Sequence, residues 1–162
     1  MRLRRLALGV AIALVGCATE PLPHSVENAR SFPMSKDQVW DNLIAYFSSN
    51  SIQIKTIEKA SGVIYAERGV DRPASYREIR HPDYADCGTP PITDIPVGHT
   101  VDLNVFVRST GSSSVAVTVN ARIKEVRRVP SAGGFSTTLE TRDCVSTGKI
   151  EEAILTAIGA PS

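Results

Sequence analysis

The sequence predicts an α+β domain in which a single antiparallel sheet of four or five strands carries two helices on one face. Within 101–108 and 115–123 apolar residues alternate with mostly polar ones, which indicates strands with one buried face. Apolar residues at helical spacing in 39–47 and 150–158 indicate two amphipathic helices. Because the apolar side of the sheet needs a cover, both helices are expected on that side.

The length and charge of the chain exclude several classes of protein. Its 162 residues are 42% hydrophobic, which suits one compact domain and is too apolar for a disordered chain. The 18 basic and 17 acidic residues nearly cancel. Because a nucleic-acid-binding surface needs an excess of positive charge, we expect no nucleic-acid partner.

The first 16 residues predict secretion. Arg2, Arg4 and Arg5 give this segment a positive start, and residues 6–15 are apolar or small. The run is too short to cross a membrane as a helix, which takes about 20 residues. A positive start followed by a short apolar run is typical of a signal peptide.

Leu14-Val15-Gly16-Cys17 closes this segment and resembles the lipobox of bacterial lipoproteins. The resemblance implies that residues 1–16 are a lipoprotein signal peptide, cleaved before Cys17. It also implies a diacylglyceryl thioether on the Cys17 sulfur and acylation of the new amino group, so that the chain contacts the bilayer through Cys17. Two or more acyl chains hold a protein stably on a membrane. The other interpretation is an ordinary signal peptide cut after Ala18.

Ala18 bears on the destination of the protein. In lipoproteins of enteric bacteria an Asp at that position retains the protein at the inner membrane, so the resemblance implies export to the outer membrane. Loss of residues 1–16 leaves 15 basic and 17 acidic residues, which disfavours electrostatic docking on anionic surfaces. We expect a lipid-anchored outer-membrane protein, facing either the periplasm or the cell surface.

Cys87 and Cys144 remain once Cys17 is modified, and an even pair in an oxidising compartment predicts a disulfide. Two alternatives stay open. One is a nucleophilic Cys87 with His81 or His99 as its base. The other is a metal site, whose candidate ligands are His81, Asp83, Asp86, Cys87 and His99. Neither has a supporting Cys-x-x-Cys or His-x-x-x-His motif, so we expect no metal.

Residues 17–28 are expected to be the lipidated cysteine and a tether, because Pro21 and Pro23 lie in a stretch without apolar periodicity. Fully extended, residues 18–28 reach up to roughly 35 Å, which lets the domain stand away from the membrane. A single domain then occupies residues 29–162.

A first strand at 29–33 is expected to lead into a helix that starts at Ser35. Gln38 completes a capping box with Ser35, and Met34 before the cap can pack on Val39. The buried stripe of this helix is expected to be Val39, Trp40, Leu43, Ile44 and Phe47.

Two hairpins and a last helix follow. Residues 52–57 and 63–67 predict one hairpin, and residues 101–108 and 115–123 predict another. The last helix is expected to be capped by Ser146 or Thr147 and to end at Gly159. Its buried residues are expected to be Ile150, Ala153, Ile154, Ala157 and Ile158.

The resulting order, β-α-β-β-β-β-α with a long loop between the hairpins, is similar to the helix-grip-like domains of BamC-type envelope lipoproteins. The residues that carry the resemblance lie in 35–41, 52–57 and 61–64. The resemblance implies a fold with a long helix held against the sheet. The Cys87 and Cys144 pair is not part of that pattern.

The long loop, residues 68–97, is the candidate contact surface. Loops of this length are often functional, and its Arg and Tyr content is typical of protein interfaces. The candidate partner-binding residues are Arg72, Tyr76, Arg77, Arg80 and Tyr84. The other interpretation is a flap that the disulfide ties over one end of the sheet. A second irregular stretch is expected at 130–141.

The expected function is non-enzymatic. The sequence has no Gly-x-Ser-x-Gly, Ser-x-x-Lys or His-Glu-x-x-His motif, and adjacent acids such as Asp83 and Asp86 are usually only solvated. An enzyme would need His81 or His99 oriented by a carboxylate beside an open cleft. We expect a module that binds another envelope protein, with no cofactor beyond the lipid. The alternative is a small-ligand binder whose pocket between sheet and helix is lined by Trp40, Tyr65 and Phe106.

Overall fold

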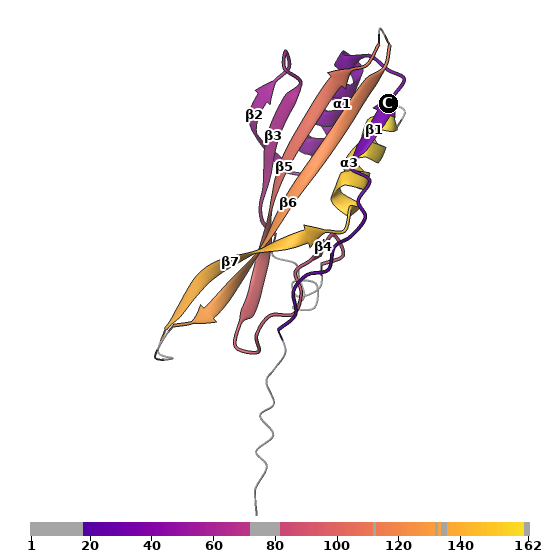
Figure 1. Cartoon of the computed structure of the whole chain (residues 1–162). Helices are drawn as coiled ribbons and strands as arrows, with labels where there is room; N and C mark the ends of the chain where they lie inside the picture. Colours follow the sequence, from indigo (N-terminus) through magenta and orange to yellow (C-terminus); the bar gives the residue numbers. More distant parts are fainter. Residues whose placement is uncertain (1–17, 72–81, 112, 132, 134–135, 161–162) are drawn as a thin grey trace, which may run out of the picture.

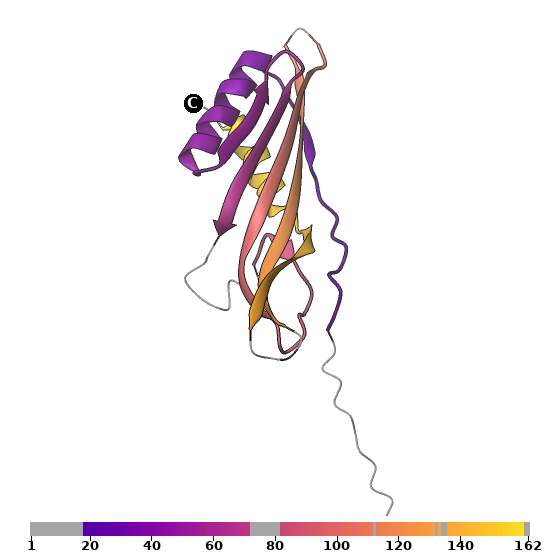
Figure 2. The ribbon, with the colours of Figure 1, turned by 90° about the vertical axis from the view of Figure 1, so that its left-hand side faces the viewer.

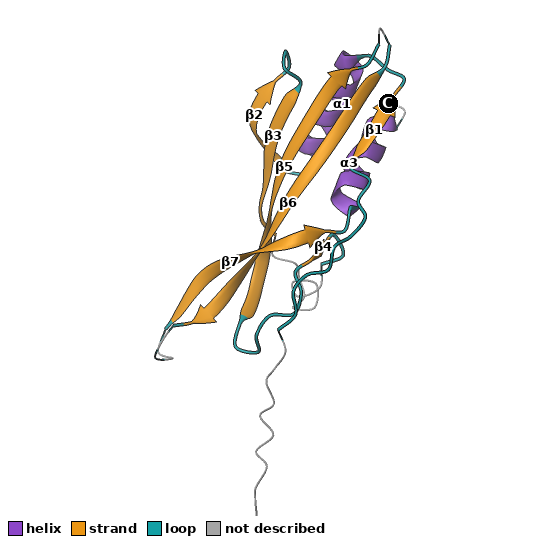
Figure 3. Ribbon diagram, in the orientation of Figure 1, coloured by secondary structure: helices purple, strands orange, loops and turns teal. Residues whose placement is uncertain are grey.

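The computed structural model describes residues 18–71, 82–111, 113–131, 133 and 136–160, and they form one sheet and two helices. The strands are β1 (Ala29–Phe32), β2 (Gln53–Glu58), β3 (Val63–Asp71), β4 (Ala85–Asp86), β5 (Ile95–Ser109), β6 (Val115–Pro130) and β7 (Thr137–Ser146), and the helices are α1 (Lys36–Ser49) and α3 (Lys149–Gly159) (Figures 1 and 3). The predicted α+β class, with an antiparallel sheet and two helices, is confirmed.

The sheet is built around the long hairpin of β5 and β6. Its strand order is β2-β3-β5-β6-β7-β4, and every paired strand runs antiparallel to its neighbour. Two strands share the outer edge of β6. β1 pairs with its first part, where Ala29 faces Thr118, and β7 pairs with its last part, from Ile123 opposite Cys144 onward.

Both helices cover the same face of the sheet, and the core lies between that face and the helices (Figure 2). α1 packs on β5 and β2, α3 packs on β6 and β1, and the two helices contact each other. The opposite face of the β3, β5 and β6 strands has no helix over it among the described residues. The fully buried side chains of this core include Val39, Leu43, Phe47, Leu103, Val105, Val119, Ile154 and Ile158.

The helix starts follow from local chemistry. At α1 the predicted capping box is present, since the Gln38 backbone N–H donates to Ser35 Oγ and the Ser35 backbone N–H donates to Gln38 Oε1. At α3 the predicted cap is wrong. Gly148, with a φ of 88°, is the N-cap, and Ser146 Oγ instead accepts from the Gly148 N–H and donates to Glu151.

The prediction of four or five strands is wrong, because the described residues form seven. β7 begins inside the stretch expected to be irregular, at Thr137, and β4 lies inside the predicted long loop. The first half of β7 is exposed and has no apolar alternation. β5 also begins earlier than predicted, at Ile95, where Pro96 and Gly98 hide the strand pattern.

Residues 18–28, the N-terminal segment, lie along the domain, whereas we expected a free tether. Thr19 forms an antiparallel bridge with Thr89, the Leu22 N–H donates to Asp86, and the Asn28 carbonyl accepts from Val119. The two prolines do not prevent this, because an extended segment offers its other backbone groups to the domain. No helix among the described residues has the length and hydropathy needed to span a membrane.

Candidate functional site

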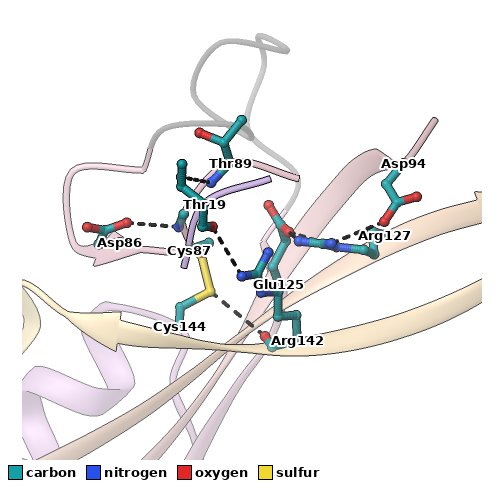
Figure 4. A network of polar contacts seen from close by, with 10 residues as sticks. Thr19, Asp86, Cys87, Thr89, Asp94, Glu125, Arg127, Arg142 and Cys144 are labelled. Atoms are coloured by element: carbon teal, nitrogen blue, oxygen red, sulfur yellow. Dashed lines mark hydrogen bonds and ion pairs between the residues drawn. A yellow bond between two sulfur atoms is a disulfide. The ribbon is translucent and has the colours of Figure 1, made fainter. Parts of the chain in front are cut away.

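The predicted disulfide between Cys87 and Cys144 is present, with the two Cα atoms 4.3 Å apart (Figure 4). It joins the residue after β4 to β7. Because both sulfurs are consumed by the bond, neither the thiol nucleophile nor the thiolate ligand proposed for Cys87 is available in this state.

Beside the disulfide lies a chain of buried charges. Arg127 Nε donates to Glu125 Oε2 at 3.0 Å, and Arg127 Nη2 contacts the same oxygen. On its other side Arg127 Nη1 donates to Asp94 Oδ2 at 3.1 Å. The side chain of Glu125 is 1% exposed and that of Arg127 is also buried. The guanidinium therefore bridges β6 to the segment that leads into β5.

His99 completes this cluster. It faces Glu125 across the β5 and β6 pair, is 0% exposed, and packs edge-on against the Tyr84 ring with centroids 5.8 Å apart. One of its ring nitrogens, a Glu125 oxygen and the Cys87 sulfur lie within 4.8 Å of one another. With Cys87 in the disulfide, the trio is reduced to one imidazole and one carboxylate, fewer than the three or four protein ligands of a zinc site. His99 does lie beside a carboxylate, but it is enclosed and does not face an open cleft.

The N-terminal segment closes over the disulfide. Thr19 and Thr89 exchange backbone hydrogen bonds of 3.1 Å in both directions, and Arg142 Nη2 donates to the Thr19 carbonyl at 3.2 Å (Figure 4). Gly88 makes the close approach possible. Its φ is +66°, and a Cβ at that position would lie 2.2 Å from the Thr19 carbonyl oxygen.

Asp86 holds the same segment through its carboxylate. One carboxylate oxygen accepts the Gly88 N–H and the other accepts the Leu22 N–H, with His24 Nε2 3.5 Å away. These interactions, led by the Gly88 hydrogen bond, lower the pKa of Asp86 from its ordinary value of 3.8. The Asp86 carboxylate is thus hydrogen-bonded both to its own loop, at Gly88, and to the N-terminal segment, at Leu22.

A hollow of about 260 Å³ opens between the end of α1, the start of α3 and the sheet, and we call it the helix-end hollow. Its floor includes Val101 and Leu103, and Lys149 pairs with Asp83 on its wall at 3.0 Å. Burial raises the pKa of Tyr46, which also lines it. The other lining residues are Asn50, Ile52, Arg68, Tyr84, Ile150 and Ala153.

Of the five predicted partner-binding residues, one lies among the described residues. Tyr84 is half-buried between the helix-end hollow and His99. The other residues of that prediction, Arg72, Tyr76, Arg77 and Arg80, lie outside the described residues, as do His81 and the predicted lipidation site Cys17.

The predicted pocket lining is wrong. Trp40 is buried in the core under the sheet. Tyr65 and Phe106 lie on the face without helices, because the buried residues Ile64 and Val105 alternate with them. Tyr65 Oη donates to Glu67 Oε1 at 2.7 Å, which raises the pKa of Tyr65 to about 12.

Sequence reasoning missed Glu125, Arg127 and Asp94. A signal was present for two of them. The inward positions of β6 run through Val119 and Ile123, and the same two-residue step reaches Glu125 and Arg127. Charged residues in the buried phase of a strand indicate paired buried charges.

No family model matches this chain, and no curated protein is significantly similar to it.

Proposed function

We propose that the chain is an outer-membrane lipoprotein, anchored through Cys17, whose domain is a non-enzymatic module that binds another envelope protein. The Cys87–Cys144 disulfide is the observation that carries this proposal, because such bonds persist in oxidising compartments outside the cytosol. The signal-peptide pattern and lipobox of residues 1–17 point to the same destination. We further propose that the fold is of the helix-grip type, with α1 as the grip helix.

The face of the sheet without helices supports a binding role. It carries the aromatic rings of Tyr65 and Phe106 among polar side chains, and a depression of about 200 Å³ lies around Phe106, Arg108, Ala116 and Thr118. Aromatic and Arg side chains are enriched in protein interfaces. The partner of this face is proposed to be an envelope protein.

Labelling with radioactive palmitate tests the anchor. Wild type is expected to incorporate label and to fractionate with the outer membrane, whereas Cys17→Ala is expected to lose both the label and the membrane association. Crosslinking in intact cells, followed by purification of the wild-type protein, tests the binding role. Absence of label in the wild type would contradict the lipid anchor, and absence of any crosslinked protein would contradict the proposed binding to an envelope protein.

The helix-end hollow supports a second candidate, a small-ligand binder. Its apolar floor and the basic side chains of Arg68 and Lys149 suit an anionic amphiphile. Titration with an anionic naphthalene dye tests this. Ala153→Trp, which fills the hollow, is expected to abolish binding, and Thr156→Trp on the exposed side of α3 is expected to leave it unchanged. Equal binding by both variants would contradict this candidate.

A further inference from the structure

Thr19 fixes the distance between the domain and its proposed anchor. Only Ala18 separates it from Cys17, and Thr19 is held by backbone hydrogen bonds to Thr89 and by Arg142. Two residues of extended chain span at most about 7 Å. A lipid on Cys17 therefore keeps this end of the domain at the membrane surface.

Three large apolar side chains are exposed at the same end of the molecule, and we call them the apolar tip. They are Ile92, 94% exposed, Ile95, 45% exposed, and Leu139, 68% exposed. Ile95 and Leu139 flank Arg128 in one row across β5, β6 and β7. Figures 1 and 2 show these strand ends and the start of the N-terminal segment at one end of the elongated domain.

The charges near the tip do not explain its exposure. Asp94 is paired with the buried Arg127, and the exposed Arg128 and Glu140 carry opposite signs. Apolar side chains without an excess of charge gain most from contact with the acyl region of a bilayer, whatever the charge of its headgroups. The proposed anchor on Cys17 brings the membrane within reach of these side chains.

We infer that the apolar tip rests in the surface of the bilayer that anchors Cys17, so that the domain stands on the membrane by the end where β5 and β7 begin. This inference depends on the proposed lipid anchor. The turns at the far end of β2 and of β5 then point away from the lipid, and the face of the sheet without helices stays open to the side.

Tryptophan scanning in vesicles tests the orientation. Lipidated Ile92→Trp and Leu139→Trp are placed in vesicles of phosphatidylethanolamine and phosphatidylglycerol, with or without bromine on the acyl chains. Ile57→Trp is the matched control, because Ile57 is 47% exposed and lies near the opposite end, in the β2 and β3 hairpin. Trp40 is buried and contributes the same background to each variant.

The expected result is a blue shift and loss of emission in brominated vesicles at positions 92 and 139, with neither change at position 57. Proteins that float with the vesicles but show no quenching at the tip, or equal quenching at position 57, would overturn the orientation while leaving the anchor intact. If the lipidated proteins do not float, the anchor fails, and the orientation fails with it.

Discussion

At the scale of the residue, Arg127 is the cation on which two acids depend. It lies between Glu125 and Asp94, and all three side chains are largely withdrawn from water. A buried pair adds little to stability compared with apolar residues, but removing one partner leaves an uncompensated charge. Replacing Arg127 alone is therefore expected to cost far more stability than the intact network provides.

Arg127→Met is expected to lower the free energy of unfolding by about 3 kcal/mol, because it leaves two carboxylates without their counter-ion. Arg128→Met is the matched control. Arg128 is the exposed neighbour in the same strand, and its loss is expected to change stability by no more than about 0.5 kcal/mol. Urea unfolding measures both, and equal effects would show that the buried network contributes nothing.

Asp86 is expected to make the free energy of unfolding depend on pH. Its pKa is lower in the folded protein than its ordinary value of 3.8, so its contribution is complete above that value and is lost as the pH falls through the folded pKa. The difference in unfolding free energy between wild type and Asp86→Asn is therefore expected to be positive near neutral pH and to shrink towards zero in strong acid.

Unfolding titrations between about pH 6 and pH 2 measure this difference. Asp143→Asn is the control, because the Asp143 side chain is 67% exposed and its contact with Arg122 is at the surface. A difference for Asp86→Asn that stays constant over this range would contradict the role assigned to its carboxylate.

At the scale of the element, local signals predicted α1 and the centre of the β5 and β6 hairpin. The capping box at Ser35 and the alternation in 101–107 belong to short stretches of sequence, and burial on one face keeps them visible. β7 gave no such signal, because the residues of its first half are exposed and nothing selects apolar side chains there. That strand forms through backbone hydrogen bonds to β6, and these groups are present whatever the side chain.

The same reasoning explains what was predictable of the candidate site. The disulfide followed from the number of cysteines and the compartment. The pairing of Arg127 with Asp94 joins residues far apart in sequence and depends on how the chain before β5 folds back. The docking of the N-terminal segment uses mainly backbone groups, so the side chains of residues 18–28 carry little trace of it.

Gly88→Ala is expected to release the N-terminal segment from the domain, because the new Cβ would lie 2.2 Å from the Thr19 carbonyl oxygen. Hydrogen exchange at the Thr19 amide measures this directly and should accelerate. Gly111→Ala is the control, since a Cβ there meets nothing within 4 Å. Protection of Thr19 that survives in Gly88→Ala would contradict the close approach.

At the scale of the whole molecule, the disulfide joins β7 to the stretch after β4, which also holds the N-terminal segment. The cysteines are 57 residues apart, so closing this loop is expected to stabilise the fold by roughly 4 kcal/mol. Cys87→Ala with Cys144→Ala should lose that amount in urea unfolding, and wild type with reductant should lose a similar amount. Cys17→Ala, which keeps the bond, should respond to reductant as wild type does. Insensitivity of the wild type to reductant would contradict this estimate.

The sharing of one β6 edge by β1 and β7 has a consequence for biosynthesis. Ala29 emerges from the ribosome early, yet its partner Thr118 is made only after most of the chain has been translated. Pairings between such distant positions form slowly. The leading part of a nascent chain thus stays unpaired, with its backbone groups bonded only to water, and any chain that stops short of β6 leaves that part free to pair with another open strand.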